Sequence, residues 1–236
     1  MGKNDGKLPD AGRRDAAVAA FLAEVARTPA PAPSEGRGRL IFAMDATASR
    51  EPTWDRAAKI QGEMFTATAS LGGLDVQLVF YRGFGECKAG PWVSDAEALV
   101  RRMTAVFCLA GQTQIAKVLR HALEETKRRK VNALVFVGDC MEENVDELAQ
   151  LAGELGLLGV PCFVFHEGAD PVAARAFKAI ARLSHGAYCA FDAASAQQLE
   201  DLLSAVAVYA AGGRKALAHF GKERGGVLLR LTRQLG

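Results

Sequence analysis

The segment Arg39–Ser49 reads RLIFAMDATAS and joins a short apolar run to a polar loop. The apolar run, Leu40–Met44, is typical of a strand that is buried on both faces of a parallel sheet. Asp45, Thr47 and Ser49 follow at alternate positions, and their oxygens converge on one point if the loop bends around it. Hard oxygen donors of this kind are the ligands that Mg²⁺ or Mn²⁺ prefers. The segment therefore predicts a strand that ends in a candidate metal-binding loop.

Apolar strands and amphipathic helices alternate along the rest of the chain. The helix expected after Thr113 is the clearest, because its apolar residues recur at helical spacing from Ile115 onward. The alternation predicts an α/β fold: a doubly wound, mostly parallel sheet of about six strands with helices on both faces. The other strands are expected at 76–81, 83–92 (ending in a short edge strand), 132–137, 160–165 and 187–191, and the other helices at 12–27, 52–71, from 95 with Ser94 as its cap, from 142, 171–183 and 195–210.

Two acids follow strands at what should be one edge of this sheet. Ligands of such sheets bind beyond the carboxyl ends of the strands. Asp139 follows the strand expected at 132–137, as Asp45 follows the first strand, and Thr113 stands before a helix on the same edge. Three separate segments thus supply five oxygen donors: Asp45, Thr47, Ser49, Thr113 and Asp139.

In this arrangement the sequence resembles a von Willebrand factor A (VWA) domain with a metal-ion-dependent adhesion site (MIDAS), over roughly Gly38–Ala210. That family has Asp-x-Ser-x-Ser after the first strand, a Thr in a later loop and an Asp after the fourth strand. The matching segments are Asp45–Ser49, Gly111–Thr113 and Val137–Asp139. The resemblance implies a Rossmann-like sheet and a divalent cation, Mg²⁺ or Mn²⁺, held by the five side chains named above. It also implies that an acidic side chain of a partner protein fills an open coordination position.

The sequence departs from the family pattern at three positions. Thr47 stands where Ser is commoner, and it keeps the hydroxyl. Cys140 replaces a frequent Gly after the last Asp. Arg50 puts a cation directly after the loop, where it would weaken metal binding or bind an acid of the partner.

The oxygen donors also have plainer interpretations. Thr47, Ser49 and Thr113 are all suited to cap the helices that follow them, and Asp139 is suited to be a loop acid or a cap. Only their joint placement at one edge of the sheet favours a metal site.

The residues that follow the later strands raise similar alternatives. Glu142 and Glu143 are expected to open a helix, where the helix dipole favours acids, and support of the metal loop is the alternative. His166 and Glu167 are expected in an exposed loop, with a partner contact as the alternative. Cys140 has no evident base beside it, so a nucleophilic role is not favoured.

The chain divides into three expected parts. Residues 1–37 comprise a helix and a Pro-rich linker, residues 38–211 the VWA-like domain, and residues 212–236 a basic tail. The tail holds six Lys and Arg residues against the single acid Glu223. The tethered N-terminal helix is free to dock on the domain or on a partner, and the tail is either a solvated extension or a binding segment.

Composition narrows the classes of protein. The 236 residues carry a formal net charge of +2, which gives no general case for nucleic acid or a membrane surface. The five cysteines are widely spaced without a CxxC pair, as expected in a reducing compartment. The N-terminal residues lack the apolar core of a secretory signal, and no apolar run approaches a membrane span. We therefore expect a cytoplasmic protein of unknown oligomeric state.

The sequence favours a non-enzymatic, metal-dependent protein-interaction module. The Ala- and Gly-rich composition favours an intracellular bacterial member of the family, and such members often act with AAA+ ATPases or stress-response proteins. One alternative is a scaffold or assembly protein that binds through its N-terminal helix or basic tail. Another is a metal-dependent hydrolase, although a phosphatase-type loop needs a second Asp where Thr47 stands and no P-loop is present.

Overall fold

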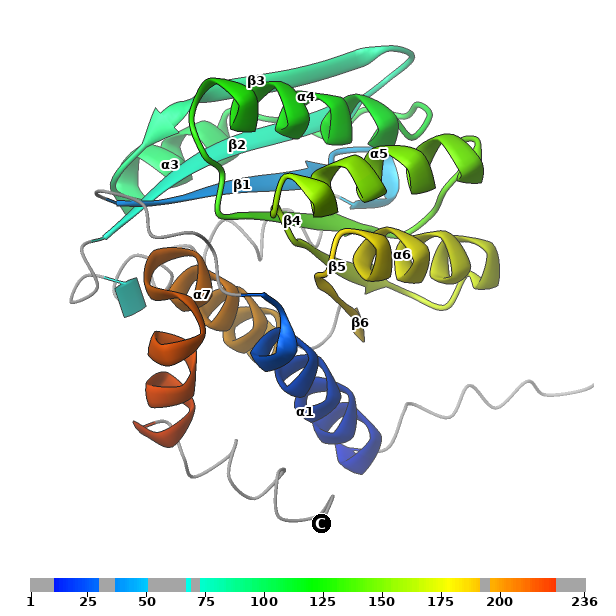
Figure 1. Cartoon of the computed structure of the whole chain (residues 1–236). Coiled ribbons are helices and arrows are strands. Elements are labelled where there is room, and N and C mark those ends of the chain that lie inside the picture. Colours follow the sequence, from blue (N-terminus) through cyan, green and yellow to red (C-terminus); the bar gives the residue numbers. More distant parts are fainter. Residues whose placement is uncertain (1–10, 30–36, 51–66, 69–72, 192–195, 224–236) are drawn as a thin grey trace, which may run out of the picture.

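The computed structural model describes residues 11–29, 37–50, 67–68, 73–191 and 196–223 (Figure 1). Most of the helix expected at 52–71 lies outside these ranges, and its described residues, Ala67 and Thr68, are helical. The side chain of Arg50 and the part of the basic tail after residue 223 also lie outside the description.

A six-stranded sheet forms the centre of the molecule, in the order β3-β2-β1-β4-β5-β6. Every neighbouring pair is parallel except β2 and β3, which form an antiparallel hairpin at one edge. The predicted mostly parallel sheet of about six strands is therefore confirmed. The strands are β1 (Gly38–Asp45), β2 (Leu74–Arg82), β3 (Glu86–Val93), β4 (Ala133–Gly138), β5 (Cys162–Glu167) and β6 (Ala187–Phe191).

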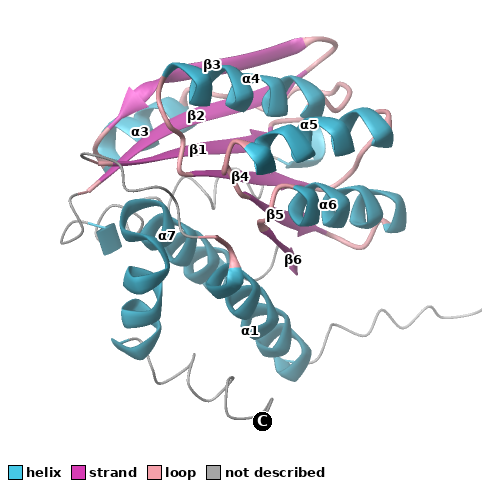
Figure 2. Cartoon of the chain, viewed as in Figure 1, coloured by secondary structure: helices cyan, strands magenta, loops and turns pink. Residues whose placement is uncertain are grey.

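Helices cover both faces of the sheet (Figure 2). On one face lie α4, α5 and α6, and on the other lie α1, α3 and α7. This two-faced covering is the predicted doubly wound arrangement. The helices are α1 (Ala11–Arg27), α3 (Ala96–Thr104), α4 (Ile115–Arg128), α5 (Val145–Leu157), α6 (Pro171–Leu183) and α7 (Ala196–Glu223), and a short 3-10 turn, η1 (Ala48–Arg50), follows β1.

The central position of β1 in the sheet explains why its apolar run is continuous. All eight of its residues are buried, because neighbours lie on both edges and helices on both faces. Leu40, Phe42 and Met44 face the core beneath α1 and α7, whereas Ile41 and Ala43 face the core beneath α4 to α6. The strand is thus fixed on four sides, and its carboxyl end is a rigid support for the loop that follows.

The N-terminal helix α1 packs on the sheet as part of the main core. Phe21 is buried and meets Phe163 and Phe165 of β5 edge-on, at ring-centroid distances of 6.1 and 5.3 Å. Past the end of α1, the Tyr209 hydroxyl on α7 donates a hydrogen bond to the carbonyl of Pro29. The apolar face of α1 is therefore occupied within the domain.

Several element boundaries differ from the sequence predictions. The cap of α3 is Asp95, whose carboxylate accepts a hydrogen bond from the N–H of Ala98, and not Ser94. Helix α7 does not stop near Ala210 but continues to Glu223 through a kink at Gly213 (φ 68°). Val145, the first residue of α5, is exposed. None of the described helices combines the length and hydrophobicity needed to cross a bilayer.

Candidate metal centre

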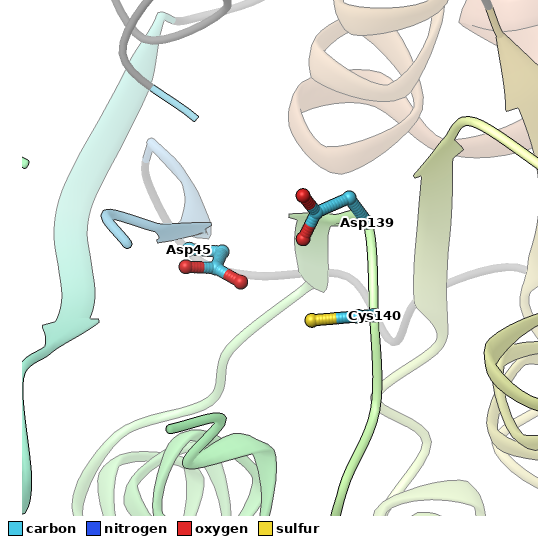
Figure 3. A group of neighbouring side chains, drawn as sticks. All are labelled: Asp45, Asp139 and Cys140. Atoms are coloured by element: carbon cyan, nitrogen blue, oxygen red, sulfur yellow. The ribbon is translucent and has the colours of Figure 1, made fainter. Parts of the chain in front are cut away.

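Two carboxylates meet at the carboxyl edge of the sheet. Asp45 is the last residue of β1, and Asp139 directly follows β4, the strand that pairs with β1 in parallel. One ligand atom each from Asp45, Asp139 and Cys140 lies within 4.8 Å of the others. The side chains of Asp139 and Cys140 both point toward Asp45 (Figure 3). The predicted juxtaposition of the two acids is present, and a thiol accompanies it.

Asp45 is buried and held by two hydrogen bonds. One carboxylate oxygen accepts from the N–H of Thr47 at 2.7 Å, and the other accepts from the Tyr81 hydroxyl at 3.1 Å. Burial raises the pKa of Asp45, the charge of Asp139 raises it further, and the bonds from Thr47 and Tyr81 act against the rise. Burial also raises the pKa of Tyr81 well above its ordinary value, so that the phenol stays a donor.

The two hydroxyls of the loop connect Asp45 to Asp139. Ser49 Oγ donates to Asp139 Oδ2 at 2.8 Å, and Thr47 Oγ1 lies 3.4 Å from Ser49 Oγ. The second oxygen of the same carboxylate, Asp139 Oδ1, is buried without a hydrogen-bond partner among the described residues. A buried, unpartnered carboxylate oxygen is costly, and a cation satisfies it. These residues therefore fit a divalent metal ion.

Thr113 is linked to the centre indirectly, through the loop between β4 and α5 that carries Asp139. Its hydroxyl accepts a hydrogen bond from the N–H of Glu142 at 3.1 Å, and its own N–H donates to the Glu142 carboxylate at 3.3 Å. Among the described residues, Thr113 makes no hydrogen bond to Asp45 or Asp139. The structure thus ties Thr113 to the β4–α5 loop that carries Asp139, while four of the five predicted donors lie in one hydrogen-bonded chain.

Glu142 and Glu143 do not open α5, contrary to the sequence prediction. Helix α5 begins at Val145 with Asn144 as its cap. The Glu143 carboxylate instead accepts from the N–H groups of Ile115 and Ala116, at 2.5 and 2.9 Å, and so caps α4 from another loop. The cap residue of α4, Gln114, makes no capping bond of its own. The sequence suggested Thr113 as the cap of this helix, so it gave no signal that an acceptor from another loop caps α4.

Replacing Glu143 with alanine is expected to lower the free energy of unfolding by about 1–2 kcal/mol, because two N–H groups of α4 lose their acceptor. Thermal unfolding should show a drop of roughly 3–6 °C. Glu97→Ala is the matched control, since Glu97 is exposed and only pairs with Arg101. An equal drop in both variants would show that the bridging cap has no special role.

His166 and Cys140 complete the surroundings of Asp139. His166 is buried within β5, not in an exposed loop, with its ring nitrogens near the Asp139 carbonyl (3.2 Å) and the Tyr188 hydroxyl (2.9 Å). Burial, followed by the charges of Asp139 and Asp45, raises the pKa of Cys140 to about 12. The thiol is therefore protonated at neutral pH in this environment.

Comparison with known proteins identifies the fold. No family model matches the sequence, and no curated protein matches it. The structure, however, superposes on the VWA domain of SpRpn10 with a TM-score of 0.55 at 14% identity, covering 71% of this chain and 94% of that one. The fold is that of a VWA domain.

Two further solved structures agree with this assignment. Proximal thread matrix protein 1 from the mussel byssus, with a zinc-occupied MIDAS motif, matches with a TM-score of 0.59 at 16% identity, over 73% of this chain and 46% of that one. A von Willebrand factor type A protein from Catenulispora acidiphila matches with a TM-score of 0.57 at 15% identity, over 73% and 43%. The match spans less than half of each of these two chains.

Proposed function

We propose that this protein is a metal-dependent protein-interaction module. The observation that carries the proposal is the pair of carboxylates on adjacent parallel strands, one of which has a buried oxygen, Asp139 Oδ1, without a hydrogen-bond partner among the described residues. Asp45, Thr47, Ser49, Thr113 and Asp139 would hold the ion. The likeness of the fold to VWA domains, including one with an occupied MIDAS, supports this role.

The charge balance of the site favours a ligand that is itself acidic. Two carboxylates neutralise a divalent ion, and the hydroxyls of Thr47, Ser49 and Thr113 add no charge. Mg²⁺ keeps several of its waters when few protein groups hold it, so a position stays open for exchange. A carboxylate of a partner protein fits that position, and the ion then bridges the two proteins.

The donor set favours Mg²⁺ or Mn²⁺, with Zn²⁺ as a second candidate. Carboxylate and hydroxyl oxygens suit the first two ions. The Cys140 thiol beside both aspartates is a softer ligand of the kind that zinc prefers. The zinc-occupied site of the mussel protein shows that another protein of this fold accepts zinc.

Calorimetric titration of chelator-treated protein with Mg²⁺, Mn²⁺ and Zn²⁺ tests the proposal. We expect saturable binding that Asp45→Ala abolishes while circular dichroism shows the variant folded, and a zinc affinity that Cys140→Ser lowers selectively. Each titration is repeated with acetate, which mimics the partner's carboxylate. An absence of binding by the wild-type protein under both conditions would overturn the proposal.

The alternatives receive less support from the structure. A scaffold that acts through its N-terminal helix needs an available apolar face, and that of α1 is occupied by the sheet and α7. A metal-dependent hydrolase of the phosphatase type needs a second Asp where Thr47 stands, and the sequence contains no P-loop. We therefore propose a binding role and not an enzymatic one. The basic tail is the second candidate binding segment.

The setting that we propose follows from composition and from the resemblance to intracellular bacterial VWA proteins. It is an adaptor in the cytoplasm, within a multiprotein, AAA+ ATPase or stress-related system. Pull-down from a bacterial lysate with Mg²⁺, and again with chelator, is the way to identify its partner.

A further inference from the structure

Three large apolar side chains stand exposed beside the metal loop. Phe84 is 85% exposed in the β2–β3 turn, and Phe107 and Leu109 are 65% and 47% exposed in the loop between α3 and α4. Both segments lie at the same end of the sheet as η1, where the β1 loop carries the metal ligands (Figure 1). Exposed apolar residues scattered singly need no explanation, but a group beside a candidate binding site does.

Backbone contacts join these residues into one surface, which we call the apolar rim (Phe84, Phe107 and Leu109). The N–H of Leu109 donates to the carbonyl of Ala46 at 3.0 Å, one residue from Asp45. The N–H of Gly83, next to Phe84, donates to the carbonyl of Leu109 at 3.3 Å. The apolar rim is therefore fixed directly to the metal loop by hydrogen bonds.

The charged groups around the apolar rim are mainly basic. The Arg82 guanidinium lies 4.2 Å from the centre of the Phe107 ring and donates to the Phe107 carbonyl. Lys117 donates to the Gly85 carbonyl at 2.8 Å, and Lys88 is exposed beside Glu86. Glu86 is the acid among these, and it pairs with both Arg82 and Lys88. These four side chains leave a net charge of +2. Glu142 and Glu143, in the loop between β4 and α5, keep their negative charges and accept hydrogen bonds from the N–H groups of Thr113, Ile115 and Ala116.

We infer that the apolar rim and the metal site form one docking surface for an acidic peptide segment that also carries bulky apolar side chains. One carboxylate of the segment would coordinate the ion, its aromatic or aliphatic side chains would cover Phe84, Phe107 and Leu109, and further acids would face Lys88 and Lys117. The exposed side chains of Lys88 and Lys117 beside the apolar rim argue against the chain's own basic tail as the occupant. The inference rests on the proposed function and names the class of partner.

The distance between the metal site and the apolar rim determines how the acidic and apolar residues of the bound peptide are spaced. Because Leu109 is bonded to Ala46, the apolar rim begins on the order of 10 Å from the aspartates. An extended peptide advances about 3.3 Å per residue, so its apolar residues should stand about three positions from the metal-binding acid. Exposed aromatic anchors of this kind commonly dominate binding at protein interfaces.

Selection from a random peptide library displayed on phage, against the full chain in Mg²⁺, tests the inference. We expect enriched peptides that combine Asp or Glu with Phe, Trp, Leu or Ile within four positions, and that are released by chelator. A triple variant, Phe84→Ser, Phe107→Ser and Leu109→Ser, should bind them at least about tenfold more weakly. Its metal affinity by calorimetry should stay unchanged, because none of the three side chains belongs to the metal site.

The control is Leu157→Ser, which removes a side chain that is 89% exposed at the last residue of α5, away from the metal loop. Acidic peptides that bind equally to the wild type and the triple variant would overturn the inference and leave the metal-dependent function standing. Apolar peptides that bind without metal, basic peptides, an absence of enrichment, or a dimer that the triple variant dissociates would each overturn it too. Failure of metal binding itself is scored separately by calorimetry.

Discussion

Asp139→Asn is expected to be more stable than the wild type in chelator and less stable than the wild type in saturating Mg²⁺. In chelator the variant should unfold at a higher temperature than the wild type, because it removes one of two carboxylates that lie within 4.8 Å of each other. In Mg²⁺ at about 100 times its dissociation constant, the wild type gains about 2.7 kcal/mol, or roughly 5–10 °C. The variant should gain almost nothing, because it has lost a charged ligand.

The reversal separates a metal site from an ordinary structural cluster. If Asp139 only held Ser49 by its 2.8 Å hydrogen bond, the variant would be equal to or less stable than the wild type under both conditions. Glu97→Gln, at an exposed helical ion pair, serves as the control and should change neither unfolding temperature appreciably. Thermal scans by circular dichroism, with and without chelator, give all the values required.

The pH dependence of stability, measured in chelator, is a second readout of the repulsion between Asp45 and Asp139. Burial, and then the charge of Asp139, raises the pKa of Asp45 above its unfolded value. The stability contributed by this group is therefore fully present below the unfolded pKa of about 3.9 and is lost as the pH rises through the folded pKa. The loss of stability between acid and neutral pH should be smaller in Asp139→Asn, since the charge that adds to the shift is absent.

The sequence predicted the sheet and the placement of Asp45 and Asp139 at one edge of it, because both follow from short-range patterns. The continuous apolar run Leu40–Met44 marks a strand with neighbours on every side, and the structure makes β1 the buried centre of the sheet. Parallel strands end at one edge, so the acids after β1 and β4 were expected on the same edge, and the pairing of β1 with β4 brings them together. The hydrogen bond from Ser49 to Asp139 extends that argument to the loop.

The parts that the sequence did not predict depend on contacts between distant segments. Nothing near Glu143 in the chain shows that its carboxylate caps α4, because the N–H groups that it accepts from, those of Ile115 and Ala116, are 28 and 27 residues away. His166 is hydrogen-bonded to Tyr188 of the next strand, 22 residues further along the chain. The apolar rim is likewise assembled from two loops whose contact is a backbone hydrogen bond. Local sequence patterns do not predict such pairings.

Gly111→Ala is expected to lower the free energy of unfolding by about 1–3 kcal/mol and to weaken metal binding as well. A Cβ at Gly111 would stand 2.0 Å from the carbonyl oxygen of Gly83, so one of the two backbones must move. Gly83 is fixed in the β2–β3 turn, and its carbonyl also accepts from the N–H of Gln112 at 3.1 Å. The strain should therefore displace the loop that leads to Thr113.

Gly153→Ala is the matched comparison, because a Cβ at Gly153 in α5 meets nothing within 4 Å. That change should stabilise the protein by about 0.5–1 kcal/mol, since alanine favours the helix over glycine. Chemical denaturation measures both stabilities, and calorimetry with Mg²⁺ measures the affinity of each variant. If Gly111→Ala lost stability while metal affinity stayed at the wild-type level, Thr113 would be excluded as a ligand that depends on this loop. A joint loss would show that the close contact between Gly111 and Gly83 positions the loop that leads to Thr113 for metal binding.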